Sequence, residues 1–168
     1  MALDCVGVRT AVKSMLEADT GTLYGTGKLL SAGEIVATEV DFETARIEAG
    51  AQATTNPYRM FLRCERGDSI DVRAQNEDCT YRVELRVEGY DMNFETVKAH
   101  VDDIIERVRY LVNAQMWAGD NLSSYYSDAG ANVLDMVSLI GDSVVEDEGG
   151  MYRVHGAMEI TVTVNRLR

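Results

Sequence analysis

The chain has 168 residues, of which 46% are hydrophobic and 26% are charged, and its formal net charge is −12. Domains run to roughly 100–200 residues, so we expect a single domain over residues 1–168. Acidic residues outnumber basic ones by 28 to 16, and no dense run of lysine and arginine occurs. Because nucleic-acid binding depends on such basic stripes, the composition argues against DNA or RNA as a tightly bound partner.

Cysteine usage indicates a reducing compartment. Cys5, Cys64 and Cys79 are odd in number and have no CxxC spacing, which argues against a disulfide framework and a thiolate metal site. We therefore expect three reduced thiols, buried or half-buried. The first residues show no basic and apolar leader, and no run approaches the roughly 20 apolar residues of a membrane span. These features predict a protein made in the cytoplasm, with no membrane partner.

The first half of the chain predicts one helix followed by strands, because a 3.6-residue apolar period gives way to alternation. The expected elements are, in order, a helix at 3–18, a loop at 20–33, a strand with an acidic face at 36–43, a loop at 48–55, a strand at 58–65, a turn at 67–68 and a short strand at 70–72.

The second half is dominated by a strand-helix-strand frame. Residues 81–88 alternate apolar and charged side chains without a break, which predicts a half-buried strand. A continuous apolar stripe predicts a long helix at 93–115, with Asn93 as its N-cap and Arg107 on its outer face. A second alternating strand is expected at 152–166.

Between that helix and the last strand the pattern is weaker. We expect a loop at 117–130, a strand at 132–141, a turn at 146–150 and a bulge at 155–156. Runs of alternating strands with helices on one face are typical of an α+β fold. The predicted fold is a mainly antiparallel β-sheet packed against a long amphipathic helix and an N-terminal helix.

No motif of catalysis or cofactor binding is complete. Residues 25–28 read Gly-Thr-Gly-Lys, but a phosphate loop also needs an earlier glycine and a serine or threonine after the lysine. His100 and His155 share no metal-ligand spacing, and we expect His100 in solvent on the polar side of the helix. The acidic run at 146–148 lacks the spacing of a calcium loop, which favours a solvated hairpin tip. We therefore expect no enzyme activity, no cofactor and no metal.

Three segments carry a pattern of residue type and spacing that spans most of the chain. The N-terminal helix runs into an acidic-Thr-Gly stop at 19–21. An alternating strand feeds a long helix through a polar turn between residues 81 and 112. The chain ends in a strand led by Gly156 and Ala157 that closes on Arg166. In these features the chain resembles the tail terminator (tail-to-head joining) proteins of tailed bacteriophages.

The resemblance implies a structural virion protein of the tail or neck, assembled in the host cytoplasm. Proteins of this family are similar to α+β sandwiches that form hexameric rings, which cap the tail tube and face the head-side connector. The implied partners are further copies of the chain, the tail tube protein and the head-tail connector. DNA is expected to pass through the lumen without specific binding, and an acidic wall suits that passage.

Surface loops are the expected contact sites, because connecting segments carry function more often than the elements they join. Tyrosine and tryptophan are enriched at interfaces, so the aromatic residues after the long helix are read either as a contact patch or as a loop folded onto the domain. The candidate contact residues are Leu29, Leu30, Glu34, Trp117, Tyr125, Tyr126, Glu146, Asp147 and Glu148.

Two other hypotheses stay open. A tail-tube or neck completion subunit would share the sheet-plus-helix architecture, but a tube protein should polymerise where a terminator forms one ring. A small ligand-binding or enzymatic α+β domain would instead place Tyr152, His155 and Glu159 in a pocket between helix and sheet.

Overall fold

The structure is a computed structural model that describes residues 5–19, 34–48, 58–73, 76–118, 122, 131–141 and 143–167. The elements are α1 (Cys5–Glu17), β1 (Ile35–Ala37), α2 (Phe42–Glu48), β2 (Tyr58–Arg73), β3 (Asn76–Asp91), α3 (Phe94–Ala118), β4 (Ala131–Ile140), β5 (Val144–Glu148) and β6 (Met151–Leu167). Three helices and a mostly antiparallel sheet confirm the predicted α+β fold.

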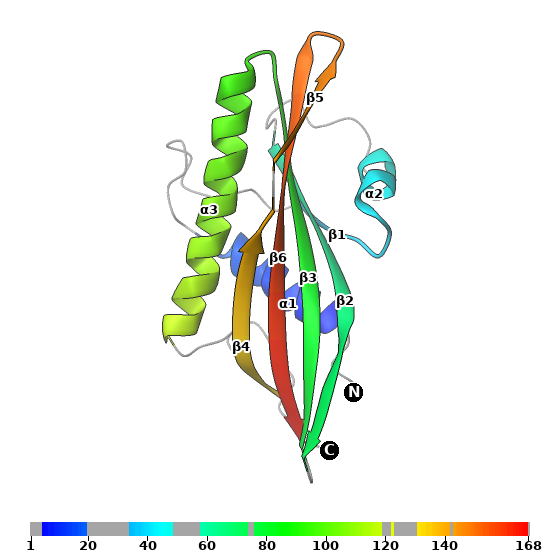
Figure 1. The fold of residues 1–168 in the computed structure, drawn as a ribbon, viewed down its shortest axis with the longest axis vertical. Helices are drawn as coiled ribbons and strands as arrows, with labels where there is room; N and C mark the ends of the chain where they lie inside the picture. Colours follow the sequence, from blue (N-terminus) through cyan, green and yellow to red (C-terminus); the bar gives the residue numbers. More distant parts are fainter. Residues whose placement is uncertain are drawn as a thin grey trace.

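One twisted sheet has the strand order β1-β2-β3-β6-β4 (Figure 1). Among the described strand pairs, the short β1–β2 pair alone is parallel. Because β3 follows one side of β6 along its whole length, β4 and β5 both pair with the other side. Together β4 and β5 therefore form one interrupted strand at the end of the described sheet.

The core lies between the sheet and two helices, α1 and α3, on the face that we call the helix face. Alternate residues of the three long strands point into it, and the apolar stripe of α3 covers them. Gly156 allows the closest approach, because a Cβ at this position would lie 2.1 Å from Cδ1 of Ile105. The strand and the helix are therefore packed against each other at a point where only glycine fits.

The start of α3 is fixed by Asn93, as predicted. Its Oδ1 accepts a hydrogen bond from the backbone N–H of Thr96 at 3.1 Å, and its carbonyl accepts one from Val97 at 3.2 Å. Side-chain acceptors at this position satisfy amide groups that the first helical turn leaves unpaired. The helix begins one residue later, at Phe94.

The helix α2 corrects a sequence prediction, because a strand was expected over residues 36–43. The strand β1 ends at Ala37, and Asp41 then caps a new helix. Oδ1 of Asp41 accepts the backbone N–H of Thr44 at 3.0 Å, and Oδ2 accepts its hydroxyl at 2.7 Å. These local bonds outweigh the alternating pattern, even though β2 continues beyond the last residue that pairs with β1.

The face of the sheet opposite α1 and α3, which we call the open face, carries Arg63, Glu84, Arg86 and Glu88. Figure 1 shows α2 on this side of the molecule, away from α3. Arg86 reaches α2 through an ion pair with Glu43 at 2.9 Å.

Three predicted irregularities lie elsewhere or are absent. The strand β2 continues through residues 67–68, where a shift of register between Arg66 and Ile70 replaces the expected turn. The turn before β6 is only Gly149 and Gly150, with φ of +66° and +97°, rather than all of 146–150. The bulge expected at 155–156 is absent, since β6 pairs with β3 without interruption there.

The three cysteines are free thiols, with Cys5 half-buried and Cys64 and Cys79 buried, as expected. Among the described helices, none has the length and apolar character needed to cross a membrane.

Candidate assembly surface

The interrupted strand formed by β4 and β5 carries an exposed apolar strip. Among the described residues, eleven large hydrophobic side chains are exposed, and six of them lie on this strip or at the first residue of β6. We call these six the β4–β5 edge: Val137, Leu139, Ile140, Val144, Val145 and Met151, which are between 36% and 68% exposed. Exposed apolar side chains gathered along one strand are typical of a protein contact surface.

The apolar character extends over both faces of the edge. Val137 and Leu139 are register partners of Thr161 and Glu159, so they share the open face. Ile140 instead pairs with Met158, a core residue of the helix face. The edge therefore presents apolar side chains in two directions.

Two hydrogen bonds fix the position of the residues that flank the break between β4 and β5. The N–H of Gly141 donates to the carbonyl of Ala157 at 2.9 Å. Two residues on, Oγ of Ser143 donates to Oδ1 of Asp102 on α3 at 2.9 Å. These bonds tie the edge to β6 and to the long helix, so the apolar strip has a fixed position on the fold.

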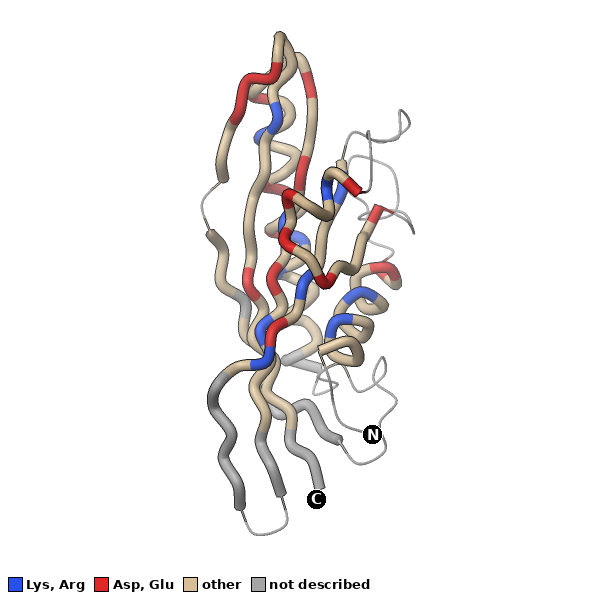
Figure 2. Tube along the Cα trace, turned by 90° about the vertical axis from the view of Figure 1, so that its right-hand side faces the viewer, with Lys and Arg blue, Asp and Glu red and all other residues tan. Residues whose placement is uncertain are grey.

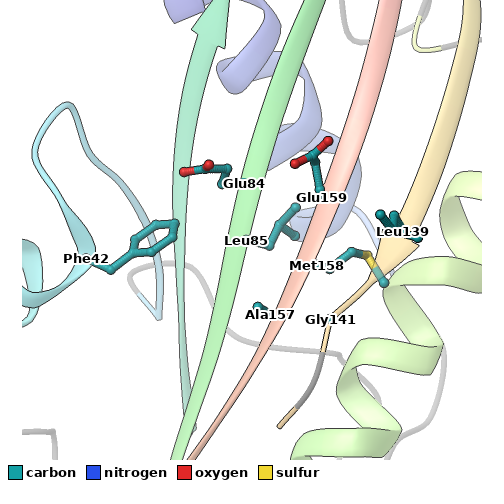
Figure 3. A pocket seen from close by; sticks show the side chains of 8 residues that line it. All are labelled: Phe42, Glu84, Leu85, Leu139, Gly141, Ala157, Met158 and Glu159. Carbon is teal, nitrogen blue, oxygen red and sulfur yellow. The ribbon is translucent and has the colours of Figure 1, made fainter. Parts of the chain in front are cut away.

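A shallow groove of about 350 Å³ lies beside Leu139 on the open face (Figure 3). Its lining residues are Phe42, Glu84, Leu85, Leu139, Gly141, Ala157, Met158 and Glu159. The two carboxylates lie side by side toward one end. Each is in an ion pair, Glu84 with Arg63 at 2.9 Å and Glu159 with Arg82 at 3.3 Å. The groove is therefore mainly apolar, and both carboxylates at its acidic end are already in ion pairs.

A cluster of charged side chains supports the other end of the edge. Arg153 of β6, whose side chain is 3% exposed, is the register partner of Glu146 and donates to its Oε2 from Nε at 2.7 Å. It also lies 3.5 Å from Glu148 and 3.5 Å from Glu43 of α2. Arg153 thus ties the β5–β6 hairpin and α2 to the same point of the sheet.

The neighbouring pair Arg86 and Glu88 continues the cluster, with Nε and Oε1 3.4 Å apart. Burial raises the pKa of Glu88, although the charges of Arg86 and Arg153 partly oppose the shift. For Glu43, burial acts in the same direction, but the hydrogen bond with Arg46 and the nearby guanidinium groups lower its pKa overall. Two carboxylates of one cluster therefore differ in the sign of their pKa shift.

The predicted contact residues stay predictions, and the structure describes only some of them. Leu29, Leu30, Tyr125 and Tyr126 lie outside the described residues. Glu34 precedes β1, where its carbonyl accepts the N–H of Met60 at 2.9 Å.

Two expectations about these residues are wrong. Trp117 belongs to α3 rather than to a loop, because the helix runs on to Ala118. Glu146, Asp147 and Glu148 form most of β5 rather than a turn. Glu146 is bound to Arg153, so it is part of the charged cluster rather than of a solvated tip. Figure 2 shows the acidic positions gathered at this hairpin end of the molecule.

The pocket proposed for a ligand-binding domain does not form as predicted. Tyr152 contacts Phe94 of α3, with ring centroids 5.9 Å apart, whereas His155 and Glu159 lie on the open face. Burial, with the charges of Arg86 and Arg153, lowers the pKa of His155. The three residues therefore do not face one cavity between helix and sheet.

His100 is also placed differently from the prediction. It is half-buried rather than solvated, and its Nδ1 lies 2.5 Å from the hydroxyl of Tyr58. Burial, together with the charge of Asp91, raises the pKa of Tyr58 to about 12. Gly89 leaves room for the tyrosine ring, since a Cβ there would lie 2.7 Å from it. This contact joins the start of β2 to α3, so we interpret it as a contact that stabilises the fold.

The β4–β5 edge itself was not among the predicted contact residues. A usable signal exists in the sequence, because adjacent apolar pairs flank the break at residues 141–143. Adjacent apolar residues point to opposite faces of a strand, so such a strand cannot bury all of them against one helix layer.

Among the described side chains, no group of three or more histidine, cysteine or acidic residues could hold a metal ion. No protein-family model matches the chain. A search of curated proteins also gives no match. Among solved structures, a chain described as part of the virion of a native gene transfer agent particle matches with a TM-score of 0.45 and 12% identity, over 96% of this chain and 99% of that chain. A similarity of this degree does not transfer a function.

Proposed function

We propose that this chain is a structural protein of a phage-like virion, and specifically a tail terminator. Copies of the chain form a ring that caps the tail tube and joins the tail to the head-side connector. The role needs no catalytic residue, cofactor or metal. The tail tube protein and the connector are the proposed partners on the two faces of the ring.

The β4–β5 edge is the observation that carries the proposal. It combines a terminal strand of the described sheet with six exposed apolar side chains. Open strand edges and apolar strips favour association, and proteins that stay monomeric usually protect both with charges or bulges. Here the edge is apolar on both of its faces, which favours a second copy of the chain as the surface that covers it.

A closed ring requires two different patches on every subunit, because its contacts run head to tail. The strands β4 and β1 lie at opposite ends of the described sheet. The helix α2 follows β1 and exposes Ile47 at 73%. We assign the second patch to this β1–α2 end, so that the β4–β5 edge of one copy meets α2 of the next.

The acidic composition is compatible with a lumen for DNA. With a net charge of −12, the chain repels a polyanion at short range rather than holding it. Phosphate binding would require lysine and arginine in excess. DNA that moves through the lumen would therefore make few specific contacts with the ring.

Native mass spectrometry and negative-stain imaging over a concentration series test the proposal, with and without purified tail tubes of the same particle. The expected result is a closed ring of about six subunits, in solution or at the tube end. Open polymers would favour a tail-tube subunit instead. A chain that stays monomeric and does not co-sediment with tubes would overturn the proposal.

A further inference from the structure

Two of the three cysteines, far apart in the sequence, belong to elements that pack together. Cys5 is the first residue of α1, is half-buried and packs against the core. Cys64 lies in β2 and is a core residue of the helix face. The helix α1 packs directly on β2. The two thiols therefore lie at a single contact between elements rather than at separate places in the fold.

The bonds around Arg9 place Cys5 over this part of β2. Arg9 lies one turn after Cys5, so both occupy the same side of α1. Nη1 of Arg9 donates to the carbonyl of Thr38 at 2.5 Å, and the N–H of Thr38 donates to the carbonyl of Leu62 at 2.8 Å. Cys64 is two residues after Leu62 and faces the same side of the strand. The helix is thus anchored with Arg9 over the part of β2 that carries Cys64.

The two thiols also act on each other. Burial raises the pKa of the Cys64 thiol, and a side-chain hydrogen bond with Cys5 raises it further. The Cys64 thiol therefore stays protonated at neutral pH. Because Cys5 is the more accessible of the two, it is the thiol that a small molecule reaches first.

We propose that Cys5 and Cys64 are a redox pair that closes to an intramolecular disulfide when the chain meets a small-molecule disulfide in an oxidising compartment. Deprotonated Cys5 attacks one sulfur of the small disulfide, and one thiol molecule leaves. The Cys64 sulfur then attacks the Cys5 sulfur of this mixed disulfide, and the second thiol molecule leaves with the Cys64 proton. The protein loses two electrons and two protons, and the small disulfide gains them as two thiols.

The bond would fasten the first turn of α1 to β2. Thiols stay reduced in the cytoplasm, while disulfides persist on particles outside the cell. The two cysteines would therefore stay reduced during assembly and form the disulfide after the particle leaves the cell. Only this timing rests on the proposed virion role, since the chemistry belongs to the folded chain alone.

The test treats the purified, folded full chain with oxidised glutathione and then measures its intact mass under denaturing, non-reducing conditions. The expected product has lost the mass of two hydrogen atoms, and peptide mapping joins Cys5 to Cys64. Cys79→Ala is the matched control, because Cys79 is buried on β3 and its thiol lies 3.8 Å from Nη2 of Arg66. This variant should react like the parent chain, whereas Cys5→Ser should not lose the two hydrogens.

Thermal unfolding gives a second readout. The oxidised chain should unfold roughly 5–15 °C higher than the reduced chain, because the bond closes a long loop of the unfolded state. The Cys5→Ser variant should show no such increase.

An unchanged mass, a stable adduct of one glutathione on Cys5, or a bond that includes Cys79 would each overturn the redox pair. None of these outcomes affects the proposed ring, which is tested on reduced protein by its assembly.

Discussion

Arg107 of α3 binds Asp19, the second residue after α1 ends, through two parallel hydrogen bonds. Nε donates to Oδ2 at 3.0 Å and Nη2 donates to Oδ1 at 2.6 Å. The Asp19 side chain is only 4% exposed, and its hydrogen bonds raise the pKa of Arg107. The pair joins the two helices of the helix face. Arg107 was expected on the outer face of α3, and its side chain is 27% exposed, but the sequence did not predict its bond with Asp19.

Replacing Asp19 by alanine should lower the free energy of unfolding by about 1–3 kcal/mol, because the half-buried Arg107 would lose both of its hydrogen bonds to Asp19. The matched control is Glu106→Ala on the same helix, whose exposed ion pair with Arg109 at 3.5 Å should contribute less than about 0.5 kcal/mol. Urea unfolding of the two variants gives the comparison. Equal losses of stability in the two variants would show that the Asp19–Arg107 pair contributes no more to the free energy of unfolding than an exposed ion pair.

Much of the fold was predictable from periodicity. The strand at 81–88 lies inside β3, and the helix at 93–115 coincides with α3 apart from its cap, Asn93. Both were predictable because their apolar residues repeat over several turns or strand positions. The strand at 36–43 was wrong although its alternation is as long as that at 81–88, because Asp41 offers the backbone a local cap. The alternation at 81–88 is instead supported by pairing with strands on both sides, β2 and β6.

The assembly surface was less predictable, for a different reason. Whether Leu139 is buried depends on which strand lies beside β4, and that order is set by tertiary pairing rather than by local sequence. The acidic residue Glu146 illustrates the same point, since its pairing with Arg153 follows from the register of β5 with β6. The sequence alone indicated which residue types to expect, but not which residues would lie beside them in the fold.

Gly156 should be intolerant of any side chain. A Cβ would lie 2.1 Å from Cδ1 of Ile105 and 3.1 Å from Cγ1 of Val101, so the buried Ile105 side chain, or α3 with it, would have to move. We expect Gly156→Ala to lower the free energy of unfolding by about 1–3 kcal/mol. Gly141→Ala is the control, since its Cβ would meet Ala157 at an ordinary 3.5 Å. Thermal or urea unfolding measures both, and a harmless Gly156→Ala would contradict the tight helix–strand packing.

The two carboxylates of the charged cluster should respond to pH with opposite signs. The folded pKa of Glu43 is lowered, so its contribution to stability is present above the unfolded value of 4.5 and is lost as pH falls through the folded pKa. The folded pKa of Glu88 is raised, so its contribution is present below 4.5 and is lost as pH rises through the folded pKa.

Urea unfolding of Glu43→Gln and Glu88→Gln across acidic and neutral pH tests these signs, each variant serving as the control of the other. Relative to the parent chain, Glu43→Gln should be less stable at neutral pH and approach it in acid. Glu88→Gln should gain relative stability as pH rises above 4.5, because a neutral amide avoids the cost of a buried charge. If the stabilities of the two variants relative to the parent chain changed with pH in the same direction, the assigned signs of the two pKa shifts would be wrong.

Leu139→Asp should separate folding from assembly. The Leu139 side chain is 68% exposed, so the charge should change the free energy of unfolding by no more than about 0.5 kcal/mol. At an apolar contact between copies the same charge would be buried without a partner, and rings should be lost in native mass spectra and negative-stain images. Met92→Asp is the control, since Met92 is 77% exposed and lies outside the β4–β5 edge. If Leu139→Asp still forms rings while Met92→Asp does not, the contact lies at the α3 start and not at the β4–β5 edge.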